Sequence, residues 1–223
     1  MIRFLDLSVM FYDIHTHKKR DLNENVISIY NLNVPDYICC CGLDLQTTYY
    51  SLGIHPWKIK ETELSKQIDF IEKNSIFDCI KAIGECGLDK LYDTPWKLQE
   101  SAFISQLLLS EKWKKPLIIH CVKSVDELIG LRKEMQAQQA WIIHGFRGKP
   151  EQAQQLINQG CYLSFGVHFN VETLQKISMK RIFFETDDAV LPIEEIYKNA
   201  ALAMEISENK LILQIEKNYK TLF

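Results

Sequence analysis

The chain has 223 residues, of which 47% are hydrophobic and 25% charged, and its formal net charge is −3. This composition is typical of a globular protein and lacks the global basic signature of nucleic-acid-binding domains. No apolar run is long enough to span a membrane, and Asp6 interrupts the apolar start of residues 1–13, which argues against a signal peptide. We therefore expect a cytoplasmic protein with one domain over residues 1–223.

The seven cysteines favour a reduced protein without a thiolate metal site. Three of them are consecutive, at positions 39–41, which suits no common disulfide framework, and no CxxC pair occurs. The other four lie mostly in apolar runs, where cysteine is a small core residue. A zinc site built on cysteine is therefore not expected.

Short apolar runs predict eight strands, and amphipathic stretches predict helices between the later ones. The later runs are almost continuously apolar, as in parallel strands that are buried on both faces. The predicted strands lie near 11–14, 26–30, 48–53, 79–84, 116–119, 140–143, 161–165 and 181–185. The predicted helices cover 62–74, 94–113, 124–137, 150–159, 170–178, 193–206 and 207–223.

Four helix starts carry recognisable signals. Thr94 precedes Pro95 as an N-cap precedes the first helical residue, and Ser124 with Glu127 fits a capping box. Pro150 is suited to a first helical position, and Ser207 is suited to cap the last helix.

The alternation of strands and helices predicts a distorted TIM (β/α) barrel. The link between the first two strands is too short and too polar for an ordinary helical crossover, so we expect a reduced first β-to-β connection. A doubly wound open sheet is the structural alternative.

Six of the predicted strands lead into a histidine, a glutamate or an aspartate. These residues are His15, His17, His55, Glu85, His120, His144 and Asp187. In a parallel barrel the carboxyl ends of all strands lie on one face, so these side chains are expected to converge. Of the six histidines, only His168 does not follow a predicted strand.

The convergent residue types predict a site for divalent metal ions. His15 and His17 are two residues apart on a strand, so both side chains point to the same side. Imidazole and carboxylate ligands suit Zn, Mn, Mg, Ni or Fe. A single histidine after a strand is more often an ordinary loop residue. The six potential ligands His15, His17, Glu85, His120, His144 and Asp187 together favour two ions, with Glu85 as the bridge.

Seven motifs in this order resemble the TatD family of metal-dependent hydrolases, part of the amidohydrolase superfamily. They are DIHTH (13–17), GIHPW (53–57), AIGECGLD (82–89), PLIIHC (116–121), WIIHGFRG (141–148), FFETD (183–187) and NYKTLF (218–223). The resemblance implies a distorted TIM barrel, a binuclear metal site and metal-dependent deoxyribonuclease or phosphodiesterase activity. It implies one ion held by His15, His17, Glu85 and Asp187, and a second held by Glu85, His120 and His144.

The chain departs from the family pattern in three places. Segment 18–47 lacks the expected early helix, HCFSG is replaced by HGFRG at 144–148, and ETDAP by ETDDA at 185–189. These changes keep every ligand position, so they bear on the substrate more than on hydrolysis.

Catalytic and substrate-binding roles are predicted for five residues. Asp187 is the candidate to orient the nucleophile and take its proton, and Glu85 is the bridging carboxylate. Arg147 can hold a phosphate in a bidentate manner. His55 contacts either the substrate or a structural hydrogen-bond partner. Glu185 either faces the site and supports the metal shell or pairs with a neighbouring Lys or Arg.

Positive charges follow several predicted strands and suggest a basic rim around the site. They are Lys18, Lys19, Arg20, Lys58, Lys90, Lys123, Arg147 and Lys149. Such a rim favours DNA or another anionic phosphodiester, although lysine is also common in solvated loops. The alternatives are hydrolysis of an ester or amide, such as deacylation of an aminoacyl-nucleic acid, and a non-catalytic metal-binding protein. We expect a monomer.

Overall fold

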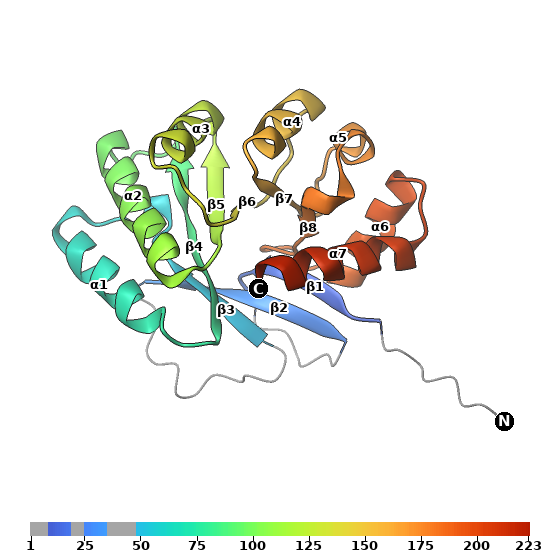
Figure 1. Ribbon diagram of the computed structural model, residues 1–223, viewed down its shortest axis with the longest axis horizontal. Helices are drawn as coiled ribbons and strands as arrows, with labels where there is room; N and C mark the ends of the chain where they lie inside the picture. Colours follow the sequence, from blue (N-terminus) through green and yellow to red (C-terminus); the bar gives the residue numbers. More distant parts are fainter. Residues whose placement is uncertain (1–8, 19–24, 35–47) are drawn as a thin grey trace.

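A computed structural model describes residues 9–18, 25–34 and 48–223, and within them eight parallel strands form a nearly closed barrel (Figure 1). The order of the strands in the sheet follows the chain from β1 to β8. Their bounds are β1 Phe11–Thr16, β2 Val26–Asn33, β3 Thr48–Gly53, β4 Ile80–Asp89, β5 Leu117–Val122, β6 Trp141–Ile143, β7 Tyr162–Phe165 and β8 Ile182–Phe184. The predicted distorted TIM barrel is confirmed.

Backbone hydrogen bonds between β1 and the residues after β8 bring the two ends of the sheet together. The amide of Asp187 donates to the carbonyl of His15 (2.9 Å), and the amide of His17 donates to the carbonyl of Asp187 (3.2 Å). The Tyr197 hydroxyl also donates to the carbonyl of Tyr12 (3.0 Å). An open, doubly wound sheet would leave these edges apart, so that alternative is wrong.

Helices follow each strand from β3 onward. Their bounds are α1 Leu64–Asn74, α2 Trp96–Trp113, α3 Val125–Glu134, α4 Pro150–Asn158, α5 Val171–Lys176, α6 Ile193–Ala203 and α7 Glu208–Leu222. None of the described helices combines the length and the apolar character that crossing a membrane requires.

The first connection is reduced, as predicted. Residues 17–25 alone join β1 to β2, and the described residues before β3 contain no helix. The rest of segment 18–47, with the cysteines at 39–41 and with Lys19 and Arg20, lies outside the described residues.

Three strands extend further than their apolar runs predict. His15, Glu85 and His120 lie inside β1, β4 and β5, not after them. Their polar side chains line the mouth of the barrel, and the backbone around them still pairs with the neighbouring strand. Gly87 of β4, for example, is paired with His120 of β5. An apolar run ends where the side chains become polar, although the backbone hydrogen bonds between strands continue. The predicted strands therefore end too early.

Two of the predicted caps are wrong because each side chain has a tertiary partner. The Thr94 hydroxyl donates to the carbonyl of Pro56 (2.9 Å), and α2 begins only at Trp96. The Ser124 hydroxyl donates to the carbonyl of Leu88 (2.8 Å) and caps nothing. Pro150 and Ser207 start α4 and α7 as predicted, and Ser207 accepts from the amide of Lys210.

Gly87 allows β4 and β5 to approach closely beside the candidate site. Its φ is +146°, and a Cβ at this position would lie 2.0 Å from the carbonyl oxygen of His120. Only glycine avoids this clash. The close approach helps to bring Glu85 and His120, from neighbouring strands, to the same point.

Candidate metal centre

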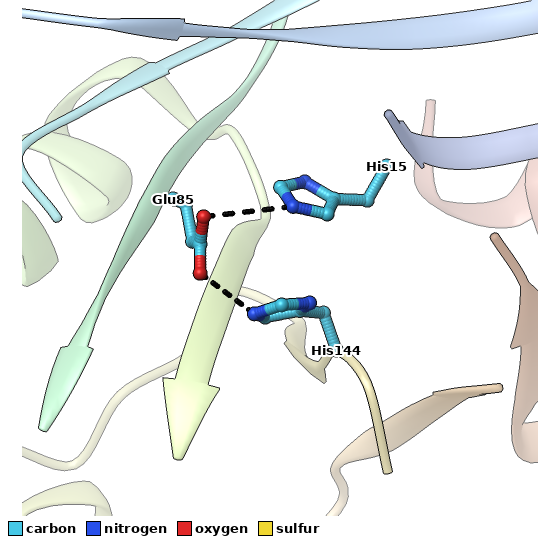
Figure 2. A group of neighbouring side chains, drawn as sticks. All are labelled: His15, Glu85 and His144. Atoms are coloured by element: carbon cyan, nitrogen blue, oxygen red, sulfur yellow. Dashed lines mark ion pairs between the residues drawn. The ribbon is translucent and has the colours of Figure 1, made fainter. Parts of the chain in front are cut away.

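Five imidazoles surround the carboxylate of Glu85, which is only 3% exposed on β4. The distances from ring nitrogen to carboxylate oxygen are 3.6 Å for His15, 3.4 Å for His17, 3.1 Å for His55, 3.1 Å for His120 and 2.7 Å for His144. Figure 2 shows His15 and His144 approaching different oxygens of this carboxylate. The predicted convergence of the strand-end residues is therefore present in the structure.

The electrostatics of the cluster favour a charged carboxylate. Burial alone would raise the pKa of Glu85, but the imidazoles of His144, His120 and His15 hold it well below its ordinary value. Burial would likewise lower the pKa of His144, yet Glu85 and Glu185 raise it well above its ordinary value. The carboxylates that hold a proton on His144 would equally attract a metal cation in its place.

Asp187 is the more exposed carboxylate of the cluster. Its Oδ1 lies 3.4 Å from His17 Nε2 and 3.8 Å from His15 Nε2, and its side chain is 33% exposed. Its φ of +51° is uncommon outside glycine, although aspartate tolerates it better than most residues. The preceding residue, Thr186, donates to buried Asp13 through its amide (2.9 Å) and its hydroxyl (2.7 Å). Asp13 therefore helps to hold Asp187 beside β1.

The donor groups fit a divalent cation. Four sets of three side chains bring one ligand atom each within 4.8 Å of one another: His15–Glu85–His144, His15–His17–Asp187, His55–Glu85–His120 and His144–Glu185–Asp187. Both ring nitrogens of His15 are buried without a hydrogen-bond partner. Buried polar atoms are normally satisfied, so an unpaired imidazole inside a carboxylate cluster fits a metal ligand.

Glu185 faces the site and contacts His144. Its Oε1 accepts from the amide of Gly145 (2.6 Å) and lies 3.2 Å from His144 Nδ1. Its side chain is fully buried, and within the described part of the chain no Lys or Arg pairs with it. The contacts agree with the first of the two alternatives, in which Glu185 supports a candidate ligand.

His55 makes the structural hydrogen bond that was one of its two predicted contacts, and it also reaches Glu85. Its Nδ1 accepts from the amide of Trp57 (3.1 Å), which is a structural hydrogen bond, and its Nε2 faces Glu85. Burial lowers the pKa of His55, which keeps its imidazole neutral and able to bind a cation. Sequence reasoning placed His55 outside the ligand set, whereas the structure groups it with Glu85 and His120.

Arg147 and His168 line one cleft beside Asp187. The cleft has a volume of about 270 Å³ and is also bordered by Glu185 and Gly166. His168 lies in the turn just after β7, which ends at Phe165, so it too belongs to the carboxyl face of the barrel. His168 does not directly follow the predicted strand 161–165, because Gly166 and Val167 lie between them.

Asp89 is a site residue that sequence reasoning did not assign. Its Oδ2 lies 3.1 Å from His120 Nε2 and accepts from the indole N–H of Trp57 (2.8 Å). The signal was available, because Asp89 stands four residues after Glu85 on the same strand and so shares its side. A carboxylate on the far nitrogen of a ligating histidine fixes the orientation of its ring.

The suggested basic rim is partly neutralised. Lys90, Lys123 and Lys149 line a second cavity of about 540 Å³, together with Asp126, Glu127 and Glu151. Lys90 forms an ion pair with Glu127, and Lys18 donates to the carbonyl of Asp188. Among the rim residues that form no ion pair in the described part of the chain, Arg147 lines the cleft beside Asp187.

Comparison with known proteins gives concordant matches. The family model described as TatD related DNase matches residues 13–223. An uncharacterised metal-dependent hydrolase of Buchnera aphidicola is 32% identical over 160 residues, which is 65% of this chain and 60% of the relative. The uncharacterised metal-dependent hydrolase YabD of Bacillus subtilis is 28% identical over 80% of both chains.

A solved structure supports the fold. The crystal structure of YjjV, a TatD homologue from Escherichia coli, superposes with a TM-score of 0.79 at 19% identity, covering 97% of this chain and 99% of that one. The chain spans only 60% of the length of the Buchnera relative described above, and 56% of the length of a second metal-dependent hydrolase from another Buchnera aphidicola strain.

Proposed function

The chain belongs to the family of TatD-related DNases, and from this premise we propose that it is a divalent-metal-dependent phosphodiesterase that hydrolyses DNA. The observation that carries the proposal is the convergence of five imidazoles on the buried carboxylate of Glu85, with Asp187 beside them. Such a set of nitrogen and oxygen donors is typical of catalytic metal sites that retain an open position.

The proposed centre holds two ions that share Glu85. His15, His17 and Asp187 would hold one ion, and His120 and His144 the other, with His55 close enough to Glu85 and His120 to contribute. When bound, such ions act as Lewis acids and lower the pKa of water to about 7.

The protein side chains around this centre have separate tasks in the proposal. Asp187 is suited to orient and deprotonate the nucleophile, because it is the cluster carboxylate that reaches solvent, whereas Glu85 is buried. Arg147 binds a phosphate oxygen of the substrate in the adjoining cleft. Glu185 and Asp89 hold His144 and His120 in place.

Parallel assays of the metal-loaded protein test the proposal. Purified without chelator, it should hydrolyse single-stranded DNA and a generic phosphodiester, and added chelator should abolish both activities. Hydrolysis of an aminoacyl ester alone would instead assign carbonyl chemistry to the site. Inactivity on all three substrates with Zn, Mn, Mg and Co would contradict a catalytic function.

A further inference from the structure

Two aromatic rings stack at the mouth of the barrel, beside the candidate metal centre. Trp57 lies in the short 3-10 helix Pro56–Lys58 after β3, and Tyr92 follows β4. Their ring centroids are 5.1 Å apart and their planes differ by only 18°. Both therefore stand on the carboxyl face of the barrel, where the metal-binding side chains converge.

The stacked pair leaves a large aromatic surface open. Stacking covers one face of each ring, yet Trp57 is still 46% exposed and Tyr92 is 43% exposed. Single exposed apolar residues are normal on protein surfaces, but two stacked, nearly parallel rings beside a candidate active site form a platform of defined orientation.

Hydrogen bonds tie the platform to the metal centre. The indole N–H of Trp57 donates to Asp89 Oδ2, and the same oxygen contacts His120 Nε2. The Trp57 ring also meets the rings of His55 and His120 edge to face, with centroids 4.8 and 5.5 Å away. The position of the indole is thereby fixed relative to the residues that would hold the reacting phosphate.

The chemistry of the platform selects a planar aromatic ligand. A nucleobase has the flat π-surface that stacks on tryptophan and tyrosine, and one sugar separates it from its phosphate. Stacking needs no particular base, so it would tolerate any sequence. It also needs an unpaired base, because the faces of bases within a duplex are covered by their neighbours.

We propose that Trp57 and Tyr92 form a stacking platform for a nucleobase next to the scissile phosphate. This inference rests on the proposed function and specifies its substrate as a nucleic-acid strand with an unpaired base. The metal centre and Arg147 then hold the phosphate, while the platform positions the base.

Calorimetric titration of the full, metal-loaded chain tests the proposal with two ligands that contain no phosphodiester bond. Deoxyadenosine 5′-monophosphate and 2-deoxyribose 5-phosphate carry the same phosphate and sugar, but only the first has a base. The wild-type protein should bind the nucleotide about 5-fold to 100-fold more tightly. Trp57→Ala should bring the nucleotide close to the affinity of the base-free ligand, and Tyr92→Ala should reduce the difference.

Two further variants separate stacking from other effects. Trp57→Phe keeps a ring face but loses the N–H donor to Asp89, so it should retain most of the preference for the base. Phe77→Ala removes an aromatic ring of equal exposure (45%) from the turn before β4, at the opposite end of the barrel. This control should leave both affinities unchanged.

Equal affinity of the wild-type protein for both ligands would overturn the platform, as would an undiminished preference in both alanine variants. Neither result depends on hydrolysis. If the base preference depends on Trp57 but no phosphodiester is cleaved, the platform stands and the proposed function fails. If DNA is cleaved without any base preference in binding, the proposed function stands and the platform fails.

Discussion

At the scale of single residues, burial distinguishes the two acidic side chains that the proposed chemistry needs. Glu85 is buried among imidazoles, where its carboxylate would be shared between the proposed ions, whereas Asp187 is 33% exposed at the edge of the same cluster. The backbone holds Asp187 in this position with two hydrogen bonds to β1, despite its left-handed φ. Unusual backbone conformations of this kind concentrate at functional sites.

Replacing Asp187 with asparagine tests its role as the base. The amide preserves the shape of the side chain but cannot take a proton, so kcat on DNA should fall by a factor of about 100 or more. Much of the bound metal should remain, because the histidine ligands and Glu85 are intact, and elemental analysis measures it. Asp188→Asn is the matched control at the next, exposed position. Wild-type turnover in Asp187→Asn would rule out the role.

Charge reversal at Arg147 tests phosphate binding in the cleft. In Arg147→Glu the lost charge-assisted hydrogen bonds should raise KM for an oligonucleotide about 10-fold to 100-fold, with little change in kcat. Lys133→Glu makes the same change of charge at the end of α3, outside the cleft. It should leave KM near the wild-type value. Similar kinetics in both variants would show that Arg147 does not contact substrate.

Residue types could be predicted from the sequence more readily than residue contacts. The pattern of histidines after apolar runs predicts the cluster, because parallel strands bring their carboxyl ends together. It did not assign His168 or Asp89, or place His55 beside Glu85 and His120. Those contacts depend on how each strand extends past its apolar run and on the path of each loop, which side-chain periodicity does not encode.

At the scale of elements, the C-terminal motif NYKTLF has a structural function. Asn218, in α7, donates through its side-chain amide to the carbonyls of Met179 (2.8 Å) and Ile182 (2.9 Å). Phe223 packs on Phe183 of β8, with ring centroids 6.2 Å apart. The last helix is thereby joined to the strand that leads to Asp187.

Substituting Asn218 with leucine should destabilise the fold. Two backbone carbonyls at the start of β8 lose their side-chain donor, which costs about 1–3 kcal/mol of unfolding free energy. Urea unfolding followed by circular dichroism measures this change. Asn158→Leu, at an exposed position at the end of α4, should change stability by no more than about 0.5 kcal/mol. Equal stability of the two variants would contradict the structural role of Asn218.

Helix starts show where local sequence rules fail. Thr94 and Ser124 have residue types suited to capping, yet both hydroxyls bond to carbonyls of residues that are distant in the sequence. Ser207 caps α7 as its local signal predicts. Local propensity decides a contact only when tertiary packing offers the side chain no competing partner.

At the scale of the whole molecule, a shortened first connection coexists with a complete set of candidate metal ligands. Only residues 17–25 join β1 to β2, but the barrel still closes through the hydrogen bonds between β1 and Asp187. Because that closure itself positions Asp187 against His15 and His17, assembly of the proposed site depends on closure of the barrel. The alternation of elements predicts a barrel but leaves a doubly wound open sheet as an alternative, and the hydrogen bonds between the two ends of the sheet decide between them.

One buried glutamate and five surrounding histidines, together with Asp187, form the proposed centre for two divalent ions. Anomalous X-ray diffraction from crystals grown with Mn²⁺ locates such ions. We expect two anomalous peaks, both in contact with the carboxylate of Glu85, one beside His15, His17 and Asp187 and the other beside His120 and His144. An anomalous map without a peak at Glu85, or with a single peak at full Mn²⁺ occupancy, would contradict the binuclear centre.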